Sequence, residues 1–228
     1  IQNMMDSLGI DENEPIDQKI LSGAIESAQK KIESRNFAAR KHVLEYDDVL
    51  NTQRKIIYAQ RLQVLEGKDV KDSIMKMIDD TIAHAVHAAI GENHLISLEM
   101  VEQARRPFIG IFLRPDDCTF TAEECDDLTA EQLTAELAEQ AHKVYDAKEQ
   151  ALTAPIMREL ERVVLLKNVD SKWMDHIDAM TELRNGIGLR AYGQHDPVVE
   201  YKREGFDMFD AMIDSIREDT VRMIFLAQ

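Results

Sequence analysis

The sequence contains a run of 43 residues, Ala24 to Glu66, without a glycine or a proline. Its apolar residues recur three, four and seven positions apart, which is the spacing of one face of an α-helix. A continuous helix of this length would be roughly 65 Å long, which is too long for a compact bundle in a chain of 228 residues. The run therefore predicts a helical strut against which several other bodies pack.

The composition favours an all-α fold for the whole chain. Only nine glycines and five prolines are present, too few for many short strands, while strong helix formers are plentiful. No apolar stretch approaches the roughly 20 residues that a membrane-spanning helix needs. The formal net charge of −16 argues against a general nucleic-acid binder, because phosphate contacts need clustered Lys and Arg.

Charge divides the sequence into three segments. Residues 67–155 hold 8 basic and 18 acidic residues, a charge of −10, whereas 1–66 carry −2 and 156–228 carry −4. Gly67 and the sequence Thr153-Ala154-Pro155 are turn or helix-end signals at the borders. We therefore expect an acidic subdomain, residues 67–154, inserted between the helical flanks 1–66 and 155–228.

The acidic subdomain has its own helix signals. Lys71 to Ala89 is amphipathic, and a second helical stretch runs from Thr129 to about Leu152, where Thr129 and Gln132 have the spacing of a capping box. The apolar run from Phe108 to Leu113 predicts either a short strand or a buried loop, and periodicity does not separate the two.

The last flank reads as two antiparallel helices joined by a loop at about residues 185–197. Gly186, Gly188 and Gly193 are expected to break the first helix. Asp196 and Pro197 supply an N-cap and a proline at the first position of the second helix. Two long helices with so short a connection must run antiparallel.

The connecting loop is rich in side chains that suit contact with another polypeptide. Apolar and aromatic groups on a glycine-hinged loop give a sequence-tolerant grip, and an arginine adds donors for backbone carbonyls. The alternative is that the loop folds down and buries these groups in its own domain. The residues concerned are Ile187, Leu189, Arg190, Tyr192, Gln194 and His195.

Two long segments resemble the SecA family, the motors of bacterial preprotein export. The first flank contains AQKKIESRNFAARKHVLEYDDVLNTQRKIIYAQR, which is similar to the long helix of the SecA helical scaffold domain. The last flank contains ELERVVLLKNVDSKWMDHIDAMTELRNGIGLRAYGQHDPVVEYKREGFDMF, which resembles the SecA two-helix finger. Residues 67–154 match the helical wing domain by position and only loosely by sequence.

The resemblance implies a mechanical role for this part of the protein. In the SecA family the finger loop enters the cytoplasmic mouth of the SecYEG channel, where a tyrosine, at Tyr192 here, contacts the translocating preprotein. Trp173, Tyr46 and Arg54 would couple the scaffold and the finger to the motor domains. The implied partners are these motor domains, SecYEG, unfolded preproteins and signal peptides, at the inner face of the bacterial plasma membrane and in the cytoplasm.

Nothing in the sequence predicts catalysis by the chain itself. No Gly-rich phosphate-binding motif accompanies the Asp47-Asp48 pair, so we expect no ATP hydrolysis and no cofactor here, with ATP and Mg²⁺ bound elsewhere in the resembled parent protein. The start at Ile1, without an initiator Met, suggests a piece of a longer protein.

Two other functions were weighed against this one. A free-standing helical adaptor or holdase would bind unfolded polypeptides without a motor. A metal-dependent enzyme would use His84, His87 and His94, but a pair of surface histidines is the favoured interpretation and we predict no metal site. Cys118 and Cys125 fit no common zinc spacing and are read as reduced thiols.

Overall fold

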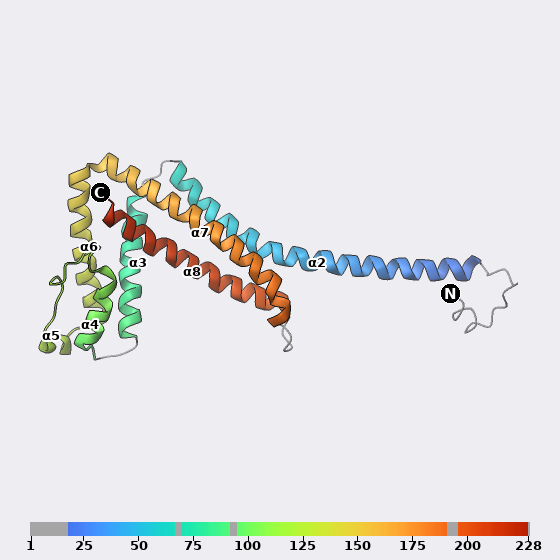
Figure 1. The fold of residues 1–228 in the computed structure, drawn as a ribbon, viewed down its shortest axis with the longest axis horizontal. Helices are drawn as coiled ribbons and strands as arrows, with labels where there is room; N and C mark the ends of the chain where they lie inside the picture. Colours follow the sequence, from blue (N-terminus) through green and yellow to red (C-terminus); the bar gives the residue numbers. More distant parts are fainter. Residues whose placement is uncertain (1–17, 67–69, 92–94, 191–195, 228) are drawn as a thin grey trace. The chain divides into compact units, whose positions relative to one another are not determined.

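The fold is helical throughout the part of the chain that the structure, a computed structural model, describes: residues 18–66, 70–91, 95–190 and 196–227. In these residues the only β-type pairing is an isolated bridge between Ile109 and Leu113. The all-α prediction is therefore confirmed. The chain divides into two compact units, Ile1–Val49 and Leu50–Gln228, and the division falls inside one helix (Figure 1).

That helix is α2, which runs from Gln18 to Leu65 over 48 residues. It confirms the prediction of one long helix, and it begins earlier than the run without glycine or proline, since Gly23 lies inside it. In the first unit every side chain from residue 22 to residue 44 is exposed. The exposed large apolar side chains are Ile25, Ile32, Phe37, Val43 and Leu44.

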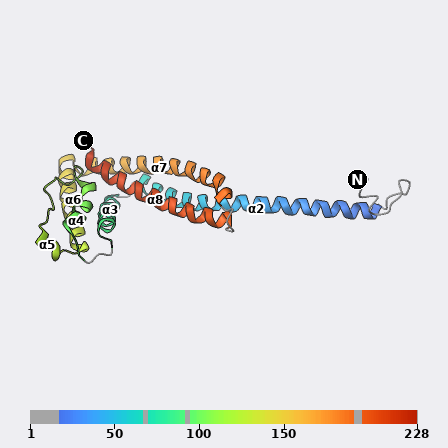
Figure 2. The same cartoon turned by 60° about the horizontal axis from the view of Figure 1, so that its bottom comes forward.

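The second unit is built around an antiparallel pair of helices, α7 (Ala154–Arg190) and α8 (Pro197–Leu226), which pack along their lengths. Residues 50–65 of α2 lie beside this pair (Figures 1 and 2). The three helices enclose a core that we call the hairpin core. Its buried residues are Ile57, Val64, Val70, Leu165, Val169, Trp173, Phe209, Met212 and Ile216.

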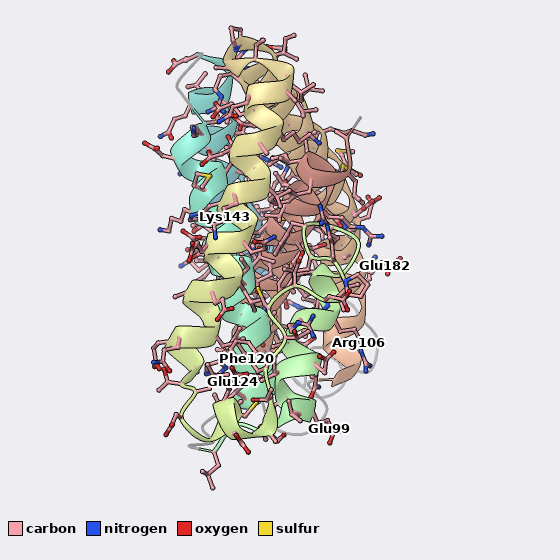
Figure 3. The ribbon with its side chains drawn as sticks, turned by 90° about the vertical axis from the view of Figure 1, so that its left-hand side faces the viewer. Glu99, Arg106, Phe120, Glu124, Lys143 and Glu182 are labelled. Atoms are coloured by element: carbon pink, nitrogen blue, oxygen red, sulfur yellow. The ribbon has the colours of Figure 1, made fainter. Side chains whose placement is uncertain are left out.

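A small helical bundle stands at one end of the pair. Its main helices are α3 (Lys71–Ile90), α4 (Leu98–Arg105) and α6 (Ala130–Leu152), and Figure 3 shows them from their outer side, with Glu99 on α4 and Lys143 on α6. Short elements, η1 (Arg106–Phe108) and α5 (Ala122–Asp126), complete it. The first turns of α7 and the last turns of α8 share the bundle core through Met157, Val164, Val221, Ile224 and Phe225.

The helices of the bundle follow the expected sequence signals. On α3 the buried residues recur every four positions from Ile74 to Ile90, which makes a single apolar stripe. Thr129 caps α6 in a reciprocal capping box with Gln132, and Thr121 caps α5 in the same way with Glu124. Both predicted helices of this segment are confirmed.

The apolar run Phe108 to Leu113 is a partly buried turn, and not a strand: Phe108, Phe112 and Leu113 are buried, whereas Ile109 is 38% exposed. The ring centroids of Phe108 and Phe112 are 4.9 Å apart. The loop that follows is held by Arg105, which is 1% exposed and donates hydrogen bonds to the carbonyl oxygens of Pro115 and Asp117. A buried guanidinium with carbonyl acceptors satisfies backbone groups that a loop would otherwise leave unpaired.

The turn between the bundle and the helix pair consists of a single residue. Thr153 separates Leu152, the last residue of α6, from Ala154, the first of α7, and its φ is 72°. A β-branched residue rarely adopts this left-handed conformation, because its side chain crowds the backbone. The sequence Thr153-Ala154-Pro155 predicts a turn at this border, and the structure has a sharp, strained turn at Thr153.

Candidate functional site

The connection between α7 and α8 holds the residues that the sequence singled out for polypeptide contact. α8 begins as expected: the Asp196 carboxylate accepts a hydrogen bond of 2.8 Å from the backbone N–H of Val198, and Pro197 is the first helical residue. α7, however, continues to Arg190, so that Gly186 lies inside it. The expectation that the glycines at 186 and 188 end the helix is wrong.

For Ile187 the sequence left two alternatives, exposure on a contact loop and burial within its own domain, and the structure supports burial, within α7. Its side chain is 2% exposed and extends the stripe of Met180 and Leu183 along α7. Burying an isoleucine contributes about 1.5–3 kcal/mol, whereas a helical glycine costs about 1 kcal/mol relative to alanine. The two glycines together cost about 2 kcal/mol, which is comparable with the gain from burying Ile187, and the helix continues past them.

Contact with another polypeptide by the other residues, Leu189, Arg190, Tyr192, Gln194 and His195, is still a prediction. Leu189 and Arg190 belong to α7, but their side chains lie outside the described residues. Tyr192, Gln194 and His195 lie wholly outside them.

Trp173, the first of the predicted coupling residues, is 5% exposed in the hairpin core. Its ring centroid lies 5.6 Å from that of His176, which in turn lies 5.7 Å from the ring of Phe209. The indole N–H is buried, and no described group accepts a hydrogen bond from it. A buried donor without an acceptor is unusual, because the lost hydrogen bond to water is not replaced.

Trp173 also lines an open groove of about 650 Å³ between α2 and α7. Tyr58, Leu62, Leu65 and Met174 border it, and each is more than half exposed. An ion pair crosses the groove, since the Arg61 guanidinium donates two hydrogen bonds, of 2.8 and 3.2 Å, to the Asp170 carboxylate. The groove thus combines apolar walls with one exposed ion pair.

The two remaining coupling candidates lie on α2. Arg54 is exposed in the second unit, next in sequence to the buried Gln53. Tyr46 is partly exposed and belongs to the first unit. Trp173 and Arg54 therefore belong to the second unit, whereas Tyr46 belongs to the first.

A buried polar contact that the sequence reasoning missed joins the three helices of the hairpin core. The amide of Gln53 donates to the carbonyl oxygen of Gly205 at 2.8 Å, and its oxygen lies 2.9 Å from Nε2 of His176. Burial lowers the pKa of the His176 imidazole below its usual value, so the ring is neutral near pH 7. A signal was available: both residues fall on apolar stripes, Gln53 between Leu50 and Ile57, and His176 between Trp173 and Met180.

A second polar network joins the helix pair to the small bundle. The fully buried Glu161 on α7 accepts a hydrogen bond from the Tyr145 hydroxyl of α6, and Arg158 bonds both that hydroxyl and Glu149. Lys71 of α3 donates to Glu149 at 2.7 Å, which holds the pKa of that carboxyl below its usual value. Burial, followed by the bond to Glu161, raises the pKa of Tyr145.

The structure contains little that would suit a metal or a membrane span. His84 and His87 are exposed on α3, and His94 lies outside the described residues. In the described ranges, no group of three or more His, Cys, Asp or Glu side chains could hold a metal ion. Nor is any of the described helices long and apolar enough to cross a bilayer.

Comparison with known proteins decides the family. Residues 15–228 match the family model of the SecA wing and scaffold domain. The chain belongs to the SecA family. It is 47% identical over 232 residues to the protein translocase subunit SecA of Syntrophomonas wolfei, covering 99% of this chain and 27% of that protein.

Two further SecA proteins give the same result. The SecA of Pelotomaculum thermopropionicum is 47% identical over 229 residues, which are 99% of this chain and 25% of the relative. The SecA of Acetivibrio thermocellus is 46% identical over 224 residues, or 98% and 25%. The chain thus spans about a quarter of the length of the SecA proteins that it matches.

Proposed function

We propose that this chain is the scaffold and wing portion of a SecA protein translocase and transmits movement from the motor domains to a translocating preprotein. In this proposal residues 1–66 and 155–228 form the helical scaffold, residues 67–154 form the wing, and the α7–α8 pair is the two-helix finger. The observation that carries it is the long antiparallel pair α7–α8, packed along its length, in a chain that matches SecA translocase subunits over 99% of its residues.

The exposed surfaces of the chain support contact with further parts of a SecA protein. The apolar side chains of α2 between residues 22 and 44 are exposed, and the groove beside Trp173 has exposed apolar walls. Apolar surface of this kind marks interaction sites in soluble proteins. We assign these surfaces to the motor domains, with Trp173, Arg54 and Tyr46 as coupling residues.

Chemistry and partners follow from the same proposal. ATP and Mg²⁺ are bound and ATP is hydrolysed in the motor domains, and this portion is not itself the enzyme. The last residues of α7, Leu189 and Arg190, and the connecting residues Tyr192, Gln194 and His195 contact unfolded preproteins and signal peptides at the SecYEG channel. The parent protein works in the cytoplasm and peripherally at the inner face of the plasma membrane.

Site-specific cross-linking tests the role of the loop. A photo-reactive amino acid replaces Tyr192 in the full-length parent, and a preprotein is stalled during translocation through SecYEG. We expect cross-links from position 192 to the preprotein and to the channel. The control carries the same amino acid at Glu99, an exposed position on the bundle (Figure 3), and equal cross-linking from both positions contradicts the proposal.

A second experiment separates a motor part from a free-standing holdase. The chain is added to the remaining domains of its parent, and ATPase rate and complex formation are measured. A SecA scaffold binds these domains and changes their rate. A chain that binds unfolded polypeptide but neither binds the domains nor changes their rate is a holdase.

A further inference from the structure

Gln53, like His176, is a hydrogen-bonded polar residue in a largely apolar seam. It lies three positions after Leu50 and four before Ile57 on α2, and it is 6% exposed. Around it are the buried side chains of the hairpin core, among them Trp173 and Phe209. An amide in this setting loses its hydrogen bonds to water, so its position is tolerable only where the protein replaces them.

The three groups of this contact admit one arrangement of donors and acceptors. The Gly205 carbonyl can only accept, so the amide nitrogen of Gln53 must face it. The amide oxygen of Gln53 then faces Nε2 of His176, and that nitrogen must carry the proton. The contact therefore specifies the orientation of the amide and the tautomer of the histidine together.

Gly205 adds a second sign that the site is specialised. It lies buried within α8, where glycine lowers helix stability relative to alanine. Without a side chain, the backbone there is open to close approach, which is what a side-chain donor from another helix needs. The carbonyl of Gly205 accepts from Gln53 across 152 positions of sequence.

Apolar contacts alone do not fix how far two helices are shifted along their common axis. Apolar side chains recur at each turn, so a slide of α2 by about one turn, roughly 5.4 Å, would bring similar groups together again. The same slide would leave the Gln53 amide, the His176 N–H and the Gly205 carbonyl site mismatched in an apolar core. Buried polar groups without partners are expensive, and a single buried amide is known to select one register in helical assemblies.

We propose that Gln53 is a positioning residue that sets the register of α2 on the α7–α8 pair through its paired contacts with His176 and Gly205. One consequence rests on the proposed function: with a fixed register, α2 and the α7–α8 pair would transmit movement without sliding along each other. The register itself is a property of this chain and can be measured without a motor or a channel.

The register is measured as a distance between two spin labels on the 228-residue chain. Labels are attached to keto amino acids at Lys55 on α2 and Val163 on α7, which are both exposed, so that the two native cysteines stay unchanged. The unsubstituted chain should give one narrow distance distribution. The double variant Gln53→Leu/His176→Leu removes the hydrogen-bonding side chains from the seam while keeping it apolar, so it should remain helical.

In this double variant we expect the distribution to broaden or to gain a second population displaced by about one helical turn, roughly 5 Å. A single narrow distribution at the original distance, with helix content unchanged, overturns the proposal. A double variant that loses its helix content also counts against it, because the contact would then be needed for folding itself and not for register.

Two matched variants separate register from general weakening. Arg61→Leu/Asp170→Leu removes an exposed contact between the same two helices and should leave the distribution narrow. His176→Gln keeps an amide N–H that can reach the Gln53 oxygen, and it should also keep one narrow population. Broadening in either variant equal to that of the leucine pair contradicts a specific role for Gln53. A narrow distance distribution in every variant would overturn the register proposal without affecting the cross-linking test of the proposed function. The two proposals can therefore be rejected independently.

Discussion

The two halves of α2 share one helix and differ in what surrounds it. From residue 22 to residue 44 every side chain is exposed, whereas from Leu50 to Leu65 the residues Gln53, Ile57 and Val64 are buried in the second unit. Both halves contain apolar residues at helical spacing. The difference teaches that periodicity predicts a helix, while a partner surface decides how stable that helix is, since isolated helices are marginal in water.

The largest expected effect comes from truncating one isoleucine in each half. Ile57→Ala opens a cavity beside Trp173 in the hairpin core and should lower the free energy of unfolding by about 2–5 kcal/mol. Ile32→Ala removes the same atoms from a side chain that is 59% exposed, and it should change the free energy by less than about 0.5 kcal/mol. Urea unfolding followed by circular dichroism measures both, and equal losses would abolish the distinction between the halves.

Hydrogen exchange sharpens the comparison along the helix. In the isolated chain, amides of residues 22–44 should exchange about 100-fold faster or more than those of residues 53–64, because local opening there breaks no apolar packing. Adding the remaining domains of the parent protein should slow exchange in the first half more than in the second. Uniform protection of the whole helix in the isolated chain would show that it needs no partner.

The smallest expected effect is a dependence of stability on pH in the packed half. Burial lowers the pKa of His176 in the folded chain, while the unfolded chain takes up the proton near pH 6.5. The unfolded state therefore binds more protons as pH falls below about 6.5, and folding loses stability there, by no more than about 1.4 kcal/mol per pH unit. Well above pH 6.5, neutral His176 makes its full contribution to the stability of the folded chain.

Urea midpoints at pH 7.5 and pH 5.5 measure this loss, with His176→Gln as the matched control. The variant has no proton to gain at this position, so its midpoint should fall less between the two pH values. The same fall in both proteins would assign the pH dependence to other groups.

Much of the fold was predictable because it is encoded by local signals. The long helix follows from a run without glycine or proline, and the starts of α6 and α8 follow from Thr129 with Gln132 and from Asp196 with Pro197. These signals act within one turn of helix, so one sequence suffices to find them.

The connection between α7 and α8 shows where local signals fail. Gly186 by itself predicts a helix end, but α7 continues past it, and the burial of Ile187 offsets the intrinsic preference of the glycine. That burial depends on what packs against α7, which the residues around position 187 do not reveal. The candidate contact residues beyond Ile187 were identified by resemblance to a family, and they stand as predictions.

The buried polar contacts were out of reach for a related reason. Gln53, His176 and Gly205 come from three distant segments, and so do Lys71, Tyr145 and Glu161. A polar residue on an apolar stripe marks a position of interest, but its partner is set by how the helices pair. The sequence could therefore flag Gln53 and His176 one at a time without joining them.

The single tryptophan of the chain gives this molecule an optical reporter at a useful point. Trp173 lines an open groove, and its ring lies among buried side chains; within the described residues no group accepts a hydrogen bond from its buried indole N–H. A bound segment that supplies an oxygen to this N–H would shift the emission to longer wavelength, while one that merely covers the groove would shift it to shorter wavelength. The emission wavelength of Trp173 in unlabelled protein can thus report both that the groove is occupied and which kind of chemical group occupies it.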